Sequence, residues 1–306
     1  NSQREKELLE LPAYIEKNDP NWIRPLDAEI QHIFNPSQNK MFHHGKLNRW
    51  ILKNNKGGKT IGRIAAFIDD KTAILNDQLT GGMGFFECIE DQKAADMLFD
   101  NAKKWLIKNG MAAADAPINF GSRQKWWGLL VDGFLPPSYG MNYNPPYYKE
   151  LFENYGFKNY FYQYSYLRPI TTENVSPVLK EKAERIFQNQ EYRREHVSKK
   201  DLNKAARDFA SIYNKAWTGH SGVSEMTEES VMEMVAEMKI IMDERLIFFA
   251  YHNNEPIGFF VQIPEINQVI KHLNGKLGLY QKLKMMYLLK FKKKCNRILG
   301  LIFGII

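Results

Sequence analysis

The stretch from Met141 to Arg168, MNYNPPYYKELFENYGFKNYFYQYSYLR, constrains the fold more than any other part of this sequence. Its two prolines, Pro145 and Pro146, suit the first turn of a helix and exclude a helix interior. Tyrosine, leucine and phenylalanine then recur at helical spacing, and Gly156 has the position of a residue that ends a helix. From there on tyrosines recur with a period of two, which is typical of strands. The pattern predicts a helix followed by two strands, the αβ edge of an α/β domain.

The sequence before this stretch has the hydrophobic periodicity of alternating helices and strands. The following elements are expected: helices at 4–16 and 27–34, strands at 49–53, 60–68 and 84–89, a long helix at 92–109, and a strand at 112–120. A short apolar segment at 128–134 precedes the closing unit. The first half therefore reads as two helices, three strands, a central helix and a strand, and then the unit described above.

The run YYKELFENYGF resembles the closing unit of the GNAT superfamily, the acyl-CoA-dependent N-acyltransferases, and the element order resembles that fold over about residues 1–168. After a linker and helix at 169–189, the order strand, helix, helix, strand, strand recurs. The resemblance implies a bacterial tandem GNAT-like protein of the α/β (α+β) class. We expect GNAT-like domains at 1–168 and 190–306, each a mixed, mostly antiparallel sheet flanked by helices. The second domain would be cut after its fourth strand, Arg297–Ile306.

GNAT proteins bind acyl-CoA along the edge of the fourth strand, and a Gln/Arg-x-x-Gly-x-Gly/Ala loop holds the pyrophosphate at the next helix N-terminus. In the first domain the corresponding run, Glu90 to Ala95, has two acids and no glycine, so it opposes a pyrophosphate. Phe152 stands where the family often has a tyrosine as general acid. The resemblance therefore implies that acetyl-CoA or a longer acyl-CoA binds the second domain, with its phosphate loop beyond the last residue. The expected cofactor-binding residues are Leu301, Phe303, Gly304 and Ile305.

The remaining candidate site residues follow from the same resemblance. Glu265, directly after the expected third strand of the second domain, is the candidate general base, and a solvated turn glutamate is the alternative. The candidate substrate-binding residues are Asn144, Tyr147, Tyr148 and Trp217. For the two tyrosines, simple aromatic packing is the alternative. No metal site is expected, because no cluster of His, Cys and Asp has metal-ligand spacing.

The net charge of +7 is distributed unevenly along the chain. Residues 271–306 contain eight lysines, one arginine and no acid, which gives +9 and leaves −2 for residues 1–270. A net-negative body makes nucleic acid an unexpected partner. Within the basic segment Lys271–Arg297, apolar residues at helical spacing predict a basic amphipathic helix inserted between two strands. Such a helix suits peripheral membrane contact, and a solvated helix packed on its own domain is the alternative.

Two functions stay open on the sequence. The leading hypothesis is an acyl-CoA-dependent N-acyltransferase that acylates a primary amine, with a small-molecule, lipid or long-chain amine as acceptor. The alternative is a non-catalytic double-GNAT binding or scaffold protein, which the missing glycines of the first domain favour. No signal-peptide pattern opens the sequence, and its longest strongly apolar run, Ile298–Ile306, is too short to cross a bilayer. A cytoplasmic protein is expected, with membrane association if the basic segment binds lipid.

Overall fold

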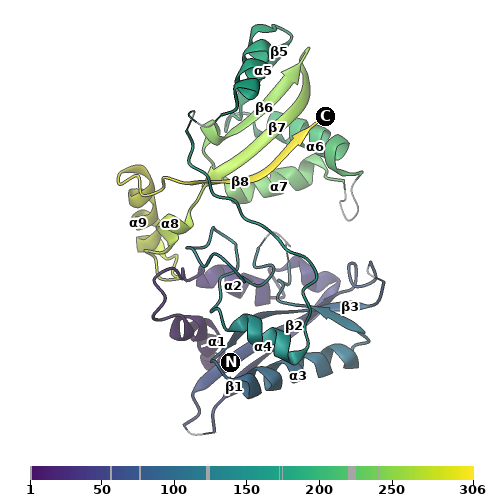
Figure 1. Cartoon of the computed structure of the whole chain (residues 1–306), viewed down its shortest axis with the longest axis vertical. Coiled ribbons are helices and arrows are strands. Elements are labelled where there is room, and N and C mark those ends of the chain that lie inside the picture. Colours follow the sequence, from purple (N-terminus) through teal and green to yellow (C-terminus); the bar gives the residue numbers. More distant parts are fainter. Residues whose placement is uncertain are drawn as a thin grey trace. The chain divides into compact units, whose positions relative to one another are not determined.

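The computed structural model describes residues 2–55, 57–75, 77–121, 125–171, 173, 175–219, 225–239 and 241–306 (Figure 1). Its contacts divide the chain into two compact units. The first unit combines residues 1–164 with 267–294, and the second combines 165–266 with 295–306. Each unit contains a four-stranded sheet flanked by helices, which confirms the predicted fold class.

The sheet of the first unit has the order β1-β2-β3-β4. Strands β1 (Gly45–Lys53), β2 (Thr60–Asp69) and β3 (Thr80–Cys88) form an antiparallel meander, and the short β4 (Ala113–Asp115) runs parallel to β3. Strand β2 is apolar on both faces, as expected for a strand that is covered by helices on either side.

Helices cover both faces of this sheet. Helices α3 (Gln92–Lys108) and α4 (Tyr148–Tyr155) pack on one face, where Ile64 and Ala66 point. Helices α1 (Ser2–Ile15) and α2 (Asp27–Phe34) cover the other, where Ala65 points; the short 3-10 helix η1 (Lys40–His43) follows them. Helix α4 ends at Gly156, whose left-handed φ of 111° is the conformation predicted for that position.

The second unit begins with α5 (Pro177–Gln188) and has the fully antiparallel sheet β5-β6-β7-β8. Its elements are β5 (Tyr192–His196), α6 (Leu202–Trp217), α7 (Glu228–Met238), η2 (Glu244–Leu246), β6 (Ile247–His252), β7 (Glu255–Pro264) and β8 (Ile298–Ile305). Helices α6 and α7 pack on the face that carries Phe249 and Phe259. The opposite face carries an aromatic row in which Phe260 contacts Phe248 and Phe303, with ring centroids 5.8 and 6.4 Å apart.

Helices α8 (Asn267–Ile270) and α9 (Leu279–Lys290) lie between β7 and β8 in the sequence but belong to the first unit. The expected boundaries placed this segment in the second domain, and the contacts differ from that expectation. Three apolar side chains explain the difference, since Val269, Ile270 and Leu273 are all buried. The segment is also tied to the first unit by hydrogen bonds from the Asp27 amide to the Gly275 carbonyl, 2.7 Å, and from Asn267 to the Pro137 carbonyl, 2.9 Å.

The two strands expected after Phe157 are not formed. Residues 157–168 have no regular secondary structure, and Tyr160 and Tyr166 are 87% and 92% exposed. Strand β4 covers only part of the expected strand at 112–120. An alternating pattern forms a strand only where a partner strand is available. Among the described residues, β4 closes the sheet at that edge and pairs with β3 alone.

Candidate functional site

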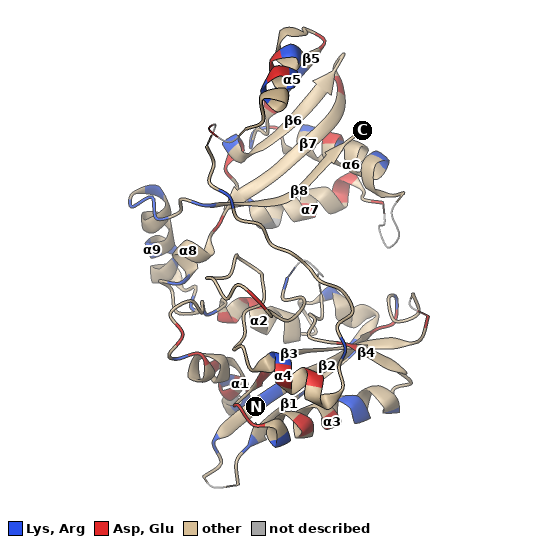
Figure 2. Cartoon of the chain, viewed as in Figure 1, with Lys and Arg blue, Asp and Glu red and all other residues tan. Residues whose placement is uncertain are grey.

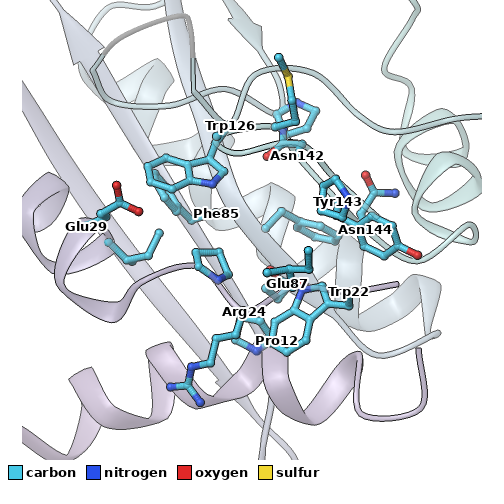
Figure 3. A pocket seen from close by; sticks show the side chains of 18 of the residues that line it. Pro12, Trp22, Arg24, Glu29, Phe85, Glu87, Trp126, Asn142, Tyr143 and Asn144 are labelled. Atoms are coloured by element: carbon cyan, nitrogen blue, oxygen red, sulfur yellow. The ribbon is translucent and has the colours of Figure 1, made fainter. Parts of the chain in front are cut away.

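A cleft of about 1130 Å³, its mouth included, lies in the first unit (Figure 3). Its walls come from α1, α2, β3, the loops at 117–118 and 126–144, helix α4 and the docked helix α8. Eight of the described lining residues are aromatic, and Figure 3 shows three of them, Trp22, Phe85 and Trp126. Such a lining suits an apolar ligand held by a few polar groups.

The polar groups of the cleft centre on a buried ion pair between two neighbouring strands. Arg63 of β2 and Glu87 of β3 pair directly in the sheet, and an Arg63 nitrogen lies 3.3 Å from a Glu87 oxygen. Their side chains are only 6% and 16% exposed. Buried charges need such partners, because an unpaired charge in an apolar interior costs several kcal/mol, on the order of 3–5.

A local irregularity of β3 precedes Glu87. Phe85 has a positive φ of 51°, and the register between β2 and β3 shifts between Arg63 and Ala65. A bulge of this kind bends a strand and re-aims the side chains near it. Glu87 follows the bulge and lines the cleft together with Phe85 and Phe86.

The two tyrosines at the start of α4 fix the end of β3. The Tyr148 hydroxyl donates to Glu87 Oε2, 2.8 Å, and accepts from the Cys88 amide, 2.9 Å. The Tyr147 hydroxyl donates to the Cys88 carbonyl, 2.8 Å. Tyr148 is buried and lines the cleft, whereas Tyr147 packs against the neighbouring core. Both hydroxyls therefore hold Glu87 and its strand in place.

Burial dominates the ionisation of this cluster. It raises the pKa of the Glu87 carboxyl above its ordinary value, an effect that the nearby Arg63 guanidinium opposes. It raises the pKa of Tyr148 far above the usual range, with the Glu87 charge adding to the effect. A carboxyl with a raised pKa is a better proton acceptor than an ordinary glutamate, which is a property expected of a general base.

A second acid, Glu16, is buried close to this cluster. Burial, together with the smaller effect of the negative charges of Glu87 and Asp19, raises its pKa to about 8. Glu16 Oε1 has no hydrogen-bond partner among the described residues, and burial without such a partner favours the neutral form. Asp19 itself accepts a hydrogen bond of 2.6 Å from Tyr143, which lines the cleft.

The other charges that line the cleft are held in ion pairs. Arg24 binds Asp27 at 3.0 Å and Glu10 at 2.9 Å. Glu29 lies 3.4 Å from the Lys125 ammonium and accepts a short hydrogen bond from Tyr139. The cleft therefore carries acidic groups, but each is paired with a cation or a hydroxyl.

The expected substrate residues fall in both units. Tyr148 and Asn144 line the cleft of the first unit. The Asn144 side chain accepts from the Leu130 amide, 2.9 Å, and donates to the carbonyls of Leu130 and Pro145, so it holds two loops together. Trp217, at the end of α6, belongs to the second unit, where its indole N–H donates to the Phe303 carbonyl at 3.1 Å.

The expected cofactor residues lie on β8 in the second unit. Leu301, Phe303 and Ile305 point to one face and are 43%, 59% and 73% exposed, whereas Gly304 is buried on the other face. β8 is an edge strand, and within the part of the chain that the structure describes, only β7 pairs with it. Glu265, the expected base, is buried where β8 begins, with its amide bonded to the Arg297 carbonyl at 3.0 Å. Ile305 pairs with Gly258, at the other end of the β7–β8 pair, so Glu265 and Ile305 lie at opposite ends of these two strands.

The N-terminus of α3 in the first unit is capped by a carboxylate of the chain itself. Asp91 is the N-cap of the helix, and its carboxylate accepts from the amides of Lys93 and Ala94, at 2.9 and 3.3 Å. In the GNAT proteins that the sequence resembles, the amides at this helix N-terminus face the pyrophosphate. The protein's own carboxylate occupies that position.

Arg63 and Glu87 are the site residues that the sequence reasoning missed. A signal was present, because each is a single charged residue within an otherwise apolar strand, TIGRIAAFI and GFFECI. Charged residues are rarely buried unless they are paired. Two such residues on neighbouring strands predict a buried pair.

No group of three or more His, Cys, Asp or Glu in the described ranges is placed to hold a metal ion. None of the helices formed by the described residues is long and apolar enough to span a membrane.

Fold and site together define a tandem α/β protein with an aromatic-walled cleft above a buried carboxylate. The chain is 28% identical over 289 residues to the bacterial ceramide synthase of Caulobacter vibrioides, covering 94% of this chain and 74% of that protein. It is 27% identical over 287 residues to protein YghO of Escherichia coli, covering 93% and 72%. Both similarities extend over nearly the whole chain and so include both units.

Among solved structures, the fold is similar to a tandem GNAT protein from the clavulanic acid biosynthesis pathway. That likeness has a TM-score of 0.47 and 11% identity, and covers 86% of this chain and 71% of the other. A probable acetyltransferase has a TM-score of 0.32 and 11% identity, covering 56% of this chain and 95% of its own. No protein-family model matches the chain.

Proposed function

We propose that this chain is an acyl-CoA-dependent N-acyltransferase whose acceptor is a primary amine with a long apolar chain. The observation that carries the proposal is the cleft of the first unit, where Glu87 lies among apolar and aromatic walls. The name of the Caulobacter relative supports the reaction class, because a ceramide is the amide of a fatty acid and a long-chain amino alcohol.

The cleft has a suitable surface for the alkyl chain of such an acceptor and another for its ammonium group. An alkyl chain gains about 0.8 kcal/mol for each CH₂ group that leaves water, and the walls provide apolar surface for it. The ammonium group is attracted to the Glu87 carboxylate, which Tyr148 and Arg63 hold in a fixed position. We expect Glu87 to accept a proton from the ammonium, because only the neutral amine is a nucleophile.

The reaction itself needs few groups from the protein. The neutral amine attacks the thioester carbonyl, and backbone N–H groups stabilise the oxyanion. The C–N bond forms, the C–S bond breaks, and CoA leaves as a thiolate. The proton that the nitrogen loses goes to the base and from there to solvent or to the thiolate.

The family resemblance implies an acyl-CoA site along the outer edge of β8, at Leu301, Phe303, Gly304 and Ile305, and we propose this site together with Glu265, a base of the same unit. The edge position of the strand supports this assignment, since pantetheine amides bind to open strand edges in the family that the sequence resembles. The capped N-terminus of α3 supports it further, because Asp91 disfavours an anion on the first unit. Glu265 is the alternative base, and the test below separates it from Glu87.

The test is a transfer assay on the purified chain with acyl-CoA and a long-chain amino alcohol in detergent micelles, read by mass spectrometry of the amide product. A short soluble amine serves as the competing acceptor. Glu87→Gln should lower kcat/KM for the amine by about 10²–10⁴-fold, the usual contribution of a general base. It should also remove the acidic limb of the pH–rate profile, because the amide does not titrate in that range.

The matched control is Glu90→Gln, an exposed acid three residues further along the chain. It should leave the rate unchanged, and calorimetric binding of CoA should be the same in all three proteins, which shows that the variants are folded. If Glu265→Gln abolishes transfer while Glu87→Gln does not, Glu265 is the base and Glu87 has a structural role.

The Asp91 cap also favours a second candidate, a protein that binds amines or lipids without turnover. That protein would bind the long-chain amine in the cleft and form no amide with any acyl-CoA. Binding of the amine without product, at enzyme concentrations that give a strong signal for a known N-acyltransferase, would establish it.

A further inference from the structure

We infer that the outward face of helix α9 is a docking surface for an anionic lipid bilayer. The inference extends the proposed function, since a bilayer would supply a long-chain acceptor. It rests on other residues, all of them outside the cleft.

The outward face of α9 is apolar and uncovered. Leu279, Leu283, Met286 and Tyr287 recur at helical spacing and are 78%, 60%, 47% and 48% exposed. Tyr280 and Phe291 extend the same face and are 71% and 77% exposed. Contiguous exposed apolar surface of this kind marks a contact with a membrane or another molecule.

The helix does not need this face for its own packing. Its opposite side carries Met285, Leu288 and Leu289, which are half-buried, and Lys284 donates to the His272 carbonyl at 2.8 Å. Apolar residues therefore lie on both sides of the helix, with lysines among them, so α9 is not the amphipathic helix that its sequence predicted. Among the described residues, only the inner side of α9 is covered by other parts of the chain. The apolar side chains of its outer side are exposed to solvent.

The charge around this face identifies the partner. Lys282 and Lys290 lie on α9, and Lys292, Lys293 and Lys294 follow directly; all five are exposed. Residues 271–306 contain no acid, and Figure 2 shows Lys and Arg but no Asp or Glu on α9 and the loop after it. Each lysine near an anionic membrane surface adds about 1 kcal/mol of attraction. Exposed tyrosines beside lysines suit the headgroup region, where amphipathic rings and long basic side chains are favoured.

Vesicle flotation tests the inference on the whole chain. Wild-type protein should float with vesicles of phosphatidylcholine and phosphatidylglycerol and remain at the bottom with phosphatidylcholine alone. Raising the salt from about 0.05 to about 0.5 M should weaken the binding, because the screening length falls severalfold. Reversing three lysines, Lys292→Glu, Lys293→Glu and Lys294→Glu, should lower the vesicle affinity by about a hundredfold or more.

Two further variants complete the design. Leu283→Glu with Met286→Glu should also abolish flotation, because it places charge on the apolar face. The matched control reverses three exposed lysines of α3 in the same unit, Lys93→Glu, Lys104→Glu and Lys108→Glu, and should float as wild type does. Equal binding to both vesicle types, or equal loss in the α3 control, would overturn the inference.

A second copy of the chain is the competing occupant of this face. Wild-type protein that does not float, but forms a dimer that Leu283→Glu with Met286→Glu dissociates, would show an interface between copies and contradict the lipid surface. Acyl transfer to the amine in detergent micelles separates the two proposals. The α9 variants should keep that activity, and a protein that floats but transfers no acyl group would refute only the proposed function.

Discussion

Two buried acids, Glu87 and Glu16, illustrate how environment decides what a carboxyl can do. Glu87 has a cation and a hydroxyl as partners, so it can hold a charge in the interior. Glu16 lies near it, but one of its oxygens has no hydrogen-bond partner among the described residues, so burial favours the protonated form. The same side chain is a candidate base in one position and a neutral acid in the other.

We predict that Glu16→Gln stabilises the protein at neutral and alkaline pH. The pKa of Glu16 is raised from 4.5 to about 8 in the folded state. Between these values the unfolded chain releases the proton and the folded chain keeps it, so wild-type stability falls as the pH rises from about 4.5 to about 8. Glutamine has no such dependence, and its advantage should be near zero at pH 4.5 and on the order of 3 kcal/mol at pH 7.

Denaturant unfolding followed at several pH values provides the measurement. Glu5→Gln, on helix α1 that ends directly before Glu16, is the control and should change the free energy of unfolding by less than about 0.5 kcal/mol. An advantage of Glu16→Gln that is constant across this range would mean that Glu16 does not titrate with a raised pKa.

At the scale of single elements, β8 shows why a glycine near an expected cofactor site can have a packing role. A Cβ on Gly304 would lie 3.0 Å from the Phe259 ring and 3.3 Å from Ile212, on the face covered by α6. A Cβ on Gly300 would lie no closer than 3.7 Å to any atom, which is an ordinary contact. Packing therefore requires a glycine at Gly304 and leaves room for a Cβ at Gly300.

Gly304→Ala should destabilise the second unit by about 1–3 kcal/mol, the usual effect of an extra methyl group in a packed core. Gly300→Ala, the matched control, should change the stability by less than about 0.5 kcal/mol. Thermal unfolding of both variants measures this, and CoA titration shows whether Gly304 also affects binding. A tolerated alanine at Gly304 would mean that Phe259 and Ile212 relax and that packing does not require the glycine.

At the scale of the whole molecule, neither unit is formed by one continuous stretch of the chain. Each unit combines two separate segments. The segment 267–294 leaves the second unit after β7, docks on the first, and returns as β8. Ile270 is 2% exposed and lines the cleft of the first unit. The last strand of the second unit therefore follows a segment that stabilises the first.

We predict that Ile270→Ala destabilises the first unit and not the second. Deleting a buried isoleucine costs about 2–5 kcal/mol. Hydrogen exchange should accelerate for amides of β2, such as Ala65 and Phe67, and stay unchanged for Phe249 and Val261 of the second unit. Ile263→Ala in β7, which is 3% exposed in wild type, should show the opposite pattern. Faster exchange in β6 and β7 on Ile270→Ala would support the boundaries expected from the sequence instead.

The sequence by itself determined the local structure. Hydrophobic periodicity and helix-ending glycines located α3, α4, α6 and the β6–β7 hairpin, because these elements are specified by residues close together in the chain. It also determined the uneven charge that marks α9, and the two acids, Glu90 and Asp91, that directly precede α3.

Only the tertiary structure decided which of these parts meet. The Arg63–Glu87 pair joins two strands and a tyrosine 60 or more residues away, and α8 fills the first unit from a position late in the chain. The alternating tyrosines after Phe157 have a strand's pattern, but no neighbouring strand pairs with them among the described residues. Pairing and burial depend on partners distant in sequence, and periodicity in one segment carries no information about those partners.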